Sequence, residues 1–149
     1  SNIQNLNLNK KFDVVVSLFH VMNYQNSDNE LLKAFKVAKE HLKNDGIFIF
    51  DFWYGPAVLK DLPTIRIKRL TNEKIKVTRI AEPVMYLDEN TVDVNYDVFI
   101  EDINSKMIIE KKEVHKMRYF FDDELDLISK ILILLTKDVY SFSNVEIVL

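Results

Sequence analysis

One continuous block, residues 11–55, constrains the fold of this chain more than any other part of its sequence. It reads KFDVVVSLFHVMNYQNSDNELLKAFKVAKEHLKNDGIFIFDFWYG. Residues 12–19 are mostly apolar, with consecutive valines, and predict a strand buried on both faces; residues 47–52 predict a second strand of the same kind. An amphipathic stretch lies between them. The block therefore predicts a β-α-β unit with two parallel strands in one sheet.

The amphipathic stretch predicts a helix that begins at Ser27-Asp28, because serine and aspartate favour the N-cap position. The closing turn is expected at Asn44-Asp45-Gly46, with Asn44 or Gly46 in the left-handed conformation that often ends a helix. Apolar side chains recur between these points at helical spacing, at Leu31, Ala34, Phe35, Ala38 and Leu42.

The pattern changes after residue 56 to stretches of period-two alternation. Residues 65–70, 74–87, 91–100 and 107–120 predict an antiparallel meander of about four strands. An acidic start at Asp122-Asp123-Glu124 then predicts a helix, much of it buried because Leu125, Leu127, Ile128, Ile131, Leu132 and Leu135 are apolar. Residues 138–142 and 145–149 predict two short final strands.

Composition excludes several classes of function. A net charge of −3 argues against nucleic acid as the main partner. The chain has no cysteine, which excludes disulfides, thiolate metal sites and a cysteine nucleophile. No apolar run is long enough to span a bilayer, so we expect no membrane partner and a cytoplasmic location. The histidines are scattered in sequence, and we expect no metal site.

Glycine is scarce, with Gly46 and Gly55 the only two in the chain. Gly-rich phosphate-binding loops need several glycines close together. No such loop can be written anywhere in this sequence.

Small-molecule sites in parallel sheets lie at the carboxyl ends of the strands. Here those ends carry aromatic and polar residues: Phe19, His20 and Tyr24 after the first strand, and Asp51, Trp53 and Tyr54 at the end of the second. His20 could act on an acceptor or simply bond to the loop backbone. Phe19 could contact a ligand or pack in the core, Tyr24 could contact a ligand or cap the sheet, and Asp51 could bind a ligand or accept bonds from local backbone donors.

Two segments resemble class I S-adenosylmethionine-dependent methyltransferases. FDVVVSLFHVMNY is similar to the fourth core strand of that family, and HLKNDGIFIFDFWYGPAV to the turn into its fifth strand. The later HKMRYFFDDELDLISK resembles the stretch before the family's last helix, and the meander resembles the β-rich cap of small-molecule methyltransferases. The resemblance implies an α/β fold, part of a doubly wound (Rossmann-like) methyltransferase sheet with an inserted antiparallel β cap. Residues 11–55 and 121–149 would form the core and residues 64–120 the cap.

The resemblance also implies a function, which is methyl transfer from S-adenosylmethionine to a nitrogen or oxygen of a small molecule. Leu18, Phe19 and His20 would contact the cofactor, and His20 is the candidate general base. The implied acceptor-binding residues are Tyr24, Asp51, Trp53, Tyr54, His115 and Arg118.

In the resembled family, the Gly-rich loop that holds the cofactor precedes the region seen here. We therefore expect this sequence to be a fragment that is inactive alone. The edge of its first strand, at Val14-Val15-Val16, is expected to pair with another chain, for example in a homodimer. The alternative is a complete non-enzymatic module that dimerises or binds a partner.

Overall fold

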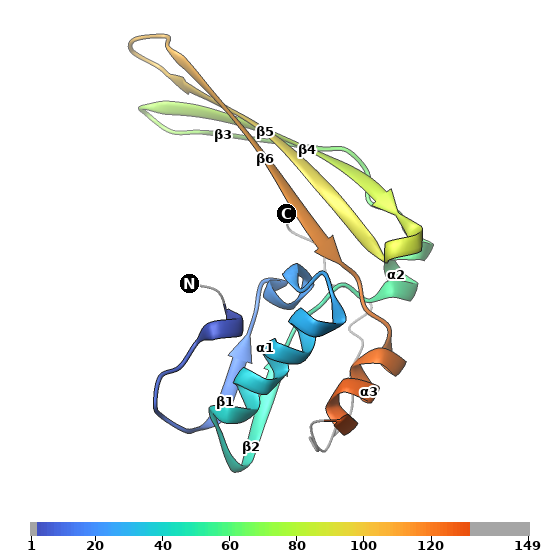
Figure 1. The fold of residues 1–149 in the computed structure, drawn as a ribbon. Helices are drawn as coiled ribbons and strands as arrows, with labels where there is room; N and C mark the ends of the chain where they lie inside the picture. The colour runs from blue at the N-terminus through green and yellow to red at the C-terminus, as the bar shows by residue number, and fades with distance from the viewer. Residues whose placement is uncertain (1–2, 132–149) are drawn as a thin grey trace. The chain divides into compact units, whose positions relative to one another are not determined.

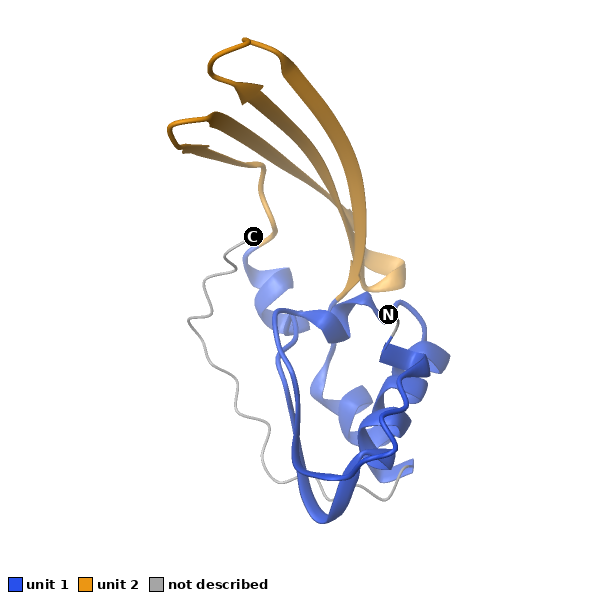
Figure 2. Ribbon diagram, turned by 90° about the vertical axis from the view of Figure 1, so that its left-hand side faces the viewer, with its two compact units in different colours: residues 1–61, 119–149 blue, residues 62–118 orange. Residues whose placement is uncertain are grey.

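The computed structural model describes residues 3–131, and these divide into two compact units (Figure 2). The first, the α/β unit, consists of the described residues of Ser1–Asp61 and Tyr119–Leu149. The second, the meander unit, is Leu62–Arg118. No helix within residues 3–131 combines the length and the apolar character needed to cross a bilayer.

The α/β unit contains the predicted β-α-β arrangement (Figure 1). Strands β1 and β2 pair in parallel as a two-stranded sheet, with helix α1 between them in the chain. The elements of this unit are η1 (Ile3–Asn5), β1 (Phe12–Ser17), η2 (Val21–Tyr24), α1 (Asp28–Glu40), β2 (Leu42–Phe50), α2 (Gly55–Lys60) and α3 (Asp122–Ile131).

Helix α1 begins where the sequence predicts. The Ser27 hydroxyl accepts a hydrogen bond from the Glu30 backbone N–H at 3.3 Å, and the Glu30 carboxylate accepts one from the Ser27 N–H at 3.1 Å. This reciprocal pair is a capping box, which satisfies backbone donors that a helix start leaves free. The predicted apolar face is confirmed, because Leu31, Ala34, Phe35 and Ala38 are all buried.

The predicted end of α1 is wrong. The helix stops at Glu40 with His41 as its C-cap, and Asn44, Asp45 and Gly46 belong to β2. Neither glycine has a positive φ. The physical reason is an irregular register: β1 advances from Phe12 to Val14 while β2 advances from Leu42 to Ile47. The turn residues are accommodated as a bulge in the strand rather than as a helix cap.

The prediction that both strands are buried on both faces is also wrong for the described structure. Val14 is 46% exposed, Val16 53% and Ile47 58%. The alternate residues Phe48 and Phe50 pack against Phe35 of α1, with ring centroids 5.5 and 5.2 Å apart. One face of the two-stranded sheet is therefore covered by α1, and the other carries exposed apolar side chains.

The core of the α/β unit joins α1, η2 and α3. Helix α3 begins at Asp122, as predicted, but its expected extensive burial is only partly correct, since Leu127 and Ile131 are exposed. Residues 132–135 and the strands predicted at 138–142 and 145–149 lie outside the described residues. The buried cluster comprises Met22, Leu31, Ala34, Phe35, Phe120, Leu125 and Ile128.

The chain leaves the α/β unit after α2 and returns beside the point it left. Tyr54 and Phe120 form a parallel bridge, in which the Gly55 N–H donates to the Phe120 carbonyl at 2.7 Å and the Phe120 N–H donates to the Trp53 carbonyl at 2.9 Å. A Cβ atom at residue 55 would lie 2.7 Å from the Phe121 ring, so glycine allows the close approach without a shift of that ring.

The meander unit confirms the predicted antiparallel sheet. Its strands follow sequence order, β3-β4-β5-β6, and every neighbouring pair is antiparallel. Its buried apolar side chains are Ala81, Val92, Val94 and Met117. The elements are β3 (Arg66–Thr71), β4 (Ile75–Tyr86), η3 (Leu87–Glu89), β5 (Thr91–Asp102) and β6 (Ile108–Arg118).

Candidate functional site

The parallel pairing of β1 and β2 brings the segments that follow them to one edge of the sheet. Ser17 is the register partner of Phe50, and the Asp51 N–H donates to the Ser17 carbonyl at 3.2 Å. Residues 18–24 and 51–54 therefore start from neighbouring positions. This is the edge at which parallel sheets hold small molecules.

The carboxylate of Asp51 binds the backbone of the loop that follows β1. Its Oδ2 accepts a hydrogen bond from the Phe19 N–H at 3.0 Å, and its Oδ1 accepts one from the His20 N–H at 2.9 Å. Phe19 and His20 both have left-handed backbone conformations, with φ of 62° and 61°. Of the two alternatives for Asp51, the structure shows bonds to backbone donors, but these donors are not local, because they lie 32 and 31 positions away in the loop after β1.

His20 lies at the start of η2, beside both Asp51 and Trp53. Its Nδ1 is 3.8 Å from Asp51 Oδ2, its side chain is 17% exposed, and its ring meets the Trp53 indole edge to face with centroids 6.1 Å apart. The Nδ1 atom is buried and has no hydrogen-bond partner. Three predicted site residues, His20, Asp51 and Trp53, are therefore brought together.

Trp53 is held in the interior of the α/β unit. The residue is 3% exposed, its backbone N–H donates to Asn23 Oδ1 at 3.3 Å, and its indole N–H is buried without a hydrogen-bond partner. Buried indole groups usually find an acceptor, so this unpaired donor is notable. Asn23, itself fully buried, was not predicted, because a single asparagine in an irregular loop gives no recognisable signal.

Tyr54 has a hydrogen-bond partner outside this cluster. Its hydroxyl donates to Asp122 Oδ2 at 3.2 Å. That hydrogen bond, together with desolvation and the negative charge of Asp122, raises the pKa of the Tyr54 phenol above its usual 10.0. Tyr24, at the end of η2, is 42% exposed.

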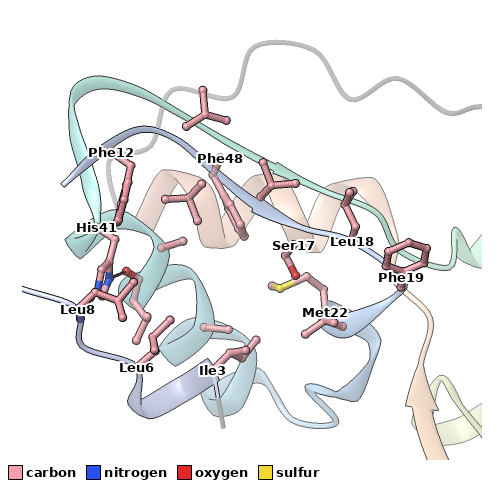
Figure 3. Close-up of a pocket in the computed structure, with 17 residues that line it drawn as sticks. Ile3, Leu6, Leu8, Phe12, Ser17, Leu18, Phe19, Met22, His41 and Phe48 are labelled. Carbon is pink, nitrogen blue, oxygen red and sulfur yellow. Dashed lines mark hydrogen bonds between the residues drawn. The ribbon is translucent and has the colours of Figure 1, made fainter. Parts of the chain in front are cut away.

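An apolar cavity of about 680 Å³ lies along β1 within the α/β unit (Figure 3). Phe12, His41 and Leu8 lie at one end of it, and Leu18, Phe19 and Met22 at the other. Phe19 is 87% exposed, so its ring is not a core side chain. The cavity reaches the candidate site through Leu18 and Phe19, whereas His20 is not part of its lining.

The two predicted residues of the meander unit, His115 and Arg118, lie on β6. The His115 ring packs edge to face on Tyr96 with centroids 5.1 Å apart, and its Nε2 is 3.2 Å from Glu113 Oε2. The guanidinium of Arg79 lies over the same tyrosine ring at 5.3 Å. Burial raises the pKa of the Tyr96 phenol. Tyr96 and Arg79 were not predicted, because their closeness to His115 depends on the register of neighbouring strands, which no single strand sequence shows.

No three histidine, aspartate or glutamate side chains within residues 3–131 gather into a group that could hold a metal ion. The chemistry available at the edge of the α/β unit is that of one imidazole, one carboxylate already bonded to backbone, and aromatic rings. These groups can orient a small molecule and accept a proton.

Comparison with solved structures defines the class of fold. No protein-family model and no curated protein matches the sequence. The chain has the fold of S-adenosylmethionine-dependent methyltransferases, a Rossmann-like α/β sheet with an antiparallel β sheet.

Three solved structures illustrate the likeness. The S-adenosylmethionine-dependent methyltransferase from Clostridium acetobutylicum is 25% identical, with a TM-score of 0.70 over 87% of this chain and 50% of that one. The sugar N-methyltransferase KedS8 from Streptoalloteichus is 16% identical, with a TM-score of 0.75 over 88% and 51%. CalS10, an amino pentose methyltransferase from Micromonospora echinaspora solved with its cofactor bound, is 18% identical, with a TM-score of 0.69 over 88% and 53%. This chain spans about half the length of the structures it matches.

Proposed function

We propose that this protein takes part in methyl transfer from S-adenosylmethionine to a nitrogen or oxygen atom of a small molecule. The observation that carries the proposal is the convergence of His20, Asp51 and Trp53 at the carboxyl edge of the parallel strands. The likeness to S-adenosylmethionine-dependent methyltransferases supports it. The net charge of −3 supports a small-molecule partner over nucleic acid. We also propose a cytoplasmic location, because a chain without cysteine suits a reducing compartment.

The cofactor would lie against Leu18, Phe19 and His20. An aromatic ring attracts a cation at its face, and the Phe19 ring is exposed at the strand end where it could meet the sulfonium. Leu18 supplies apolar contact from the same loop. Substitution of Phe19 by alanine should weaken cofactor binding about tenfold, whereas Leu59→Ala, on the exposed surface of α2, should not.

The chemical step would be an in-line displacement at the methyl carbon. Bound S-adenosylmethionine would supply the methyl group from its sulfonium, and the acceptor nitrogen or oxygen would take that group and give up a proton. His20 is the group proposed to accept that proton, while the main contribution of the site is positioning. Tyr24, Trp53 and Tyr54 would supply the walls of the acceptor site, with Asp51 as its carboxylate.

The meander is proposed to serve as a cap, with residues 64–120 inserted into a core of residues 11–55 and 121–149. His115 and Arg118 would contact the acceptor from this cap. Two of the similar structures are named as sugar or amino pentose methyltransferases, so an amino sugar is the first acceptor to test.

We further propose that the chain alone lacks a complete cofactor site and is inactive. Its two glycines cannot form the Gly-rich loop that holds a nucleotide cofactor in such sheets. Calorimetric titration of the chain with S-adenosylhomocysteine tests this directly. No binding by a folded chain is the expected result. Affinity in the micromolar range would contradict the incomplete site, and methyl transfer could then be assayed on this chain with labelled S-adenosylmethionine.

The methyl-transfer proposal itself is tested on the product of the whole gene. That protein should bind S-adenosylhomocysteine and lose affinity in the Phe19→Ala variant. A whole protein that folds but does not bind this ligand would contradict the proposal.

The second candidate function is a non-enzymatic module that dimerises or binds a partner. The specific observation in its favour is the edge of β1: within the described residues β1 pairs with β2 alone, and its Val14 and Val16 side chains are exposed. Light scattering on the chain separates a self-associating module from a monomer.

A further inference from the structure

The carboxylate of Asp51 makes three contacts with one loop. It accepts hydrogen bonds from the N–H groups of Phe19 and His20, and it faces the His20 imidazole with 3.8 Å between Oδ2 and Nδ1. These contacts join residues more than thirty positions apart in the sequence, because Asp51 directly follows β2 and the loop directly follows β1.

The loop has a backbone shape that needs an external partner. Phe19 and His20 are consecutive, neither is glycine, and both have a positive φ. Residues with a side chain rarely adopt this conformation, and they keep it only when surrounding contacts enforce it. The two hydrogen bonds to Asp51 are such contacts, and charge on the acceptor makes them stronger than neutral ones.

The same carboxylate also lies near the Nδ1 atom of the His20 imidazole. A neutral histidine has its hydrogen on either Nδ1 or Nε2, and the partner of one nitrogen sets the role of the other. His20 Nδ1 is buried and has no other partner, while Asp51 Oδ2 lies 3.8 Å away. That separation is longer than a hydrogen bond, but an anion still favours the tautomer that directs an N–H toward it.

We propose that Asp51 is a positioning residue that holds the Phe19–His20 loop and fixes His20 as the Nδ1–H tautomer. The lone pair is then on Nε2, the nitrogen left to accept a proton. This assignment adds detail to the proposed function, and the importance of the tautomer for catalysis rests on that function. This role is compatible with the proposed contact of Asp51 with the acceptor, because each carboxylate oxygen that is bonded to the loop keeps a further lone pair.

The test is nitrogen-15 NMR of the labelled chain at a pH where histidines are neutral. Two-bond couplings from the ring nitrogens to the ring hydrogens report which nitrogen is protonated. His20 should show the proton on Nδ1 in the wild-type chain. His41 is an internal reference for this tautomer, because its Nδ1 lies 2.7 Å from the Val37 carbonyl and its Nε2 accepts from the Leu8 N–H.

The Asp51→Asn variant should shift His20 toward the Nε2–H tautomer and leave His41 unchanged. It should also speed hydrogen exchange of the Phe19 and His20 amides about tenfold, because the loss of one charge-assisted hydrogen bond makes opening of the loop about tenfold more frequent. Asp45→Asn is the matched control, since Asp45 is an exposed aspartate of β2. It should change neither readout.

A wild-type His20 with its proton on Nε2 would overturn the proposal, as would an Asp51→Asn chain with unchanged tautomer and unchanged exchange. If the variant does not fold, two measurements on the wild-type chain still test the proposal. One is the His20 tautomer, and the other is the scalar coupling from the Phe19 amide nitrogen to the Asp51 carboxyl carbon, which reports the hydrogen bond between them. These readouts need no ligand. A His20 fixed as Nδ1–H in a whole protein that binds no S-adenosylhomocysteine would sustain the role of Asp51 and reject the proposed function.

Discussion

The phenol of Tyr54 donates a hydrogen bond of 3.2 Å to the carboxylate of Asp122, which ties the segment after β2 to the first turn of α3. The two residues flank the inserted meander in sequence, yet both belong to the α/β unit. Asp122 also suits its position, because a negative charge is favourable at a helix N-terminus. One carboxylate therefore serves the helix start and holds the tyrosine.

This contact predicts a pH dependence of stability. The hydrogen bond to Asp122 raises the pKa of Tyr54 above 10.0, so the folded chain retains this proton at pH values where the unfolded chain releases it. The stabilisation is fully present below pH 10.0 and is lost as the pH rises through the pKa of the folded state. The difference between ultraviolet titrations of the wild-type chain and Tyr54→Phe should show Tyr54 ionising late, and Asp122→Asn should bring it back. Ionisation at the ordinary value in the wild-type chain would contradict the assignment.

The capping box of α1 gives a prediction about stability. Substitution of Ser27 by alanine removes the acceptor for the Glu30 N–H and should lower the free energy of unfolding by about 1 kcal/mol. Ser27→Asp keeps a capping oxygen and should recover most of the loss. Urea denaturation followed by circular dichroism measures both. Equal stability of the alanine and aspartate variants would show that the cap does not stabilise the folded chain.

The elements with local sequence signals could be predicted. Ser27 and Glu30 lie three residues apart and mark a helix start by themselves, and the alternation of the meander follows from each strand having two faces. The end of α1 could not be predicted in the same way. Gly46 looked like a helix cap, but the register of β1 against β2 places it in a strand, and register depends on the partner strand.

Burial was predicted least well, for a physical reason. An apolar strand such as β1 is buried on both faces only if something covers both, and its sequence does not say what does. Val14 and Val16 are exposed because they lie on the face of the sheet that α1 does not cover. The positive φ values of Phe19 and His20 could not be predicted either, since phenylalanine gives no signal for this conformation and histidine only a weak one. Asp51 imposes that conformation from the neighbouring strand end.

The aromatic cluster of Phe35, Phe48 and Phe50, formed between α1 and β2, should contribute much of the stability of the α/β unit. Phe35 is 3% exposed and packs against Phe48 and Phe50. Phe35→Ala should therefore cost about 3–5 kcal/mol of unfolding free energy. Phe19→Ala is the matched control, because the same atoms are removed from a ring that is 87% exposed, and its cost should stay below about 0.5 kcal/mol. Similar losses in the two variants, measured by chemical denaturation, would show that this cluster is not the core.

The edge of β1 predicts self-association of this chain. Backbone groups on an unpaired strand edge are open to another strand, and the exposed Val14 and Val16 add apolar surface beside them. Multi-angle light scattering should show a mass that rises with concentration. Lysines at both positions should suppress the rise, because charged side chains on an edge oppose strand pairing. Val84→Lys is the control: Val84 is also an exposed valine, but it lies in the meander unit, where it pairs with Asp93 of β5, so its substitution leaves the edge of β1 unchanged. A wild-type chain that stays monomeric at every concentration would reject association through this edge, and a Val84→Lys chain that also lost it would show that exposed apolar area, rather than the free edge, is responsible.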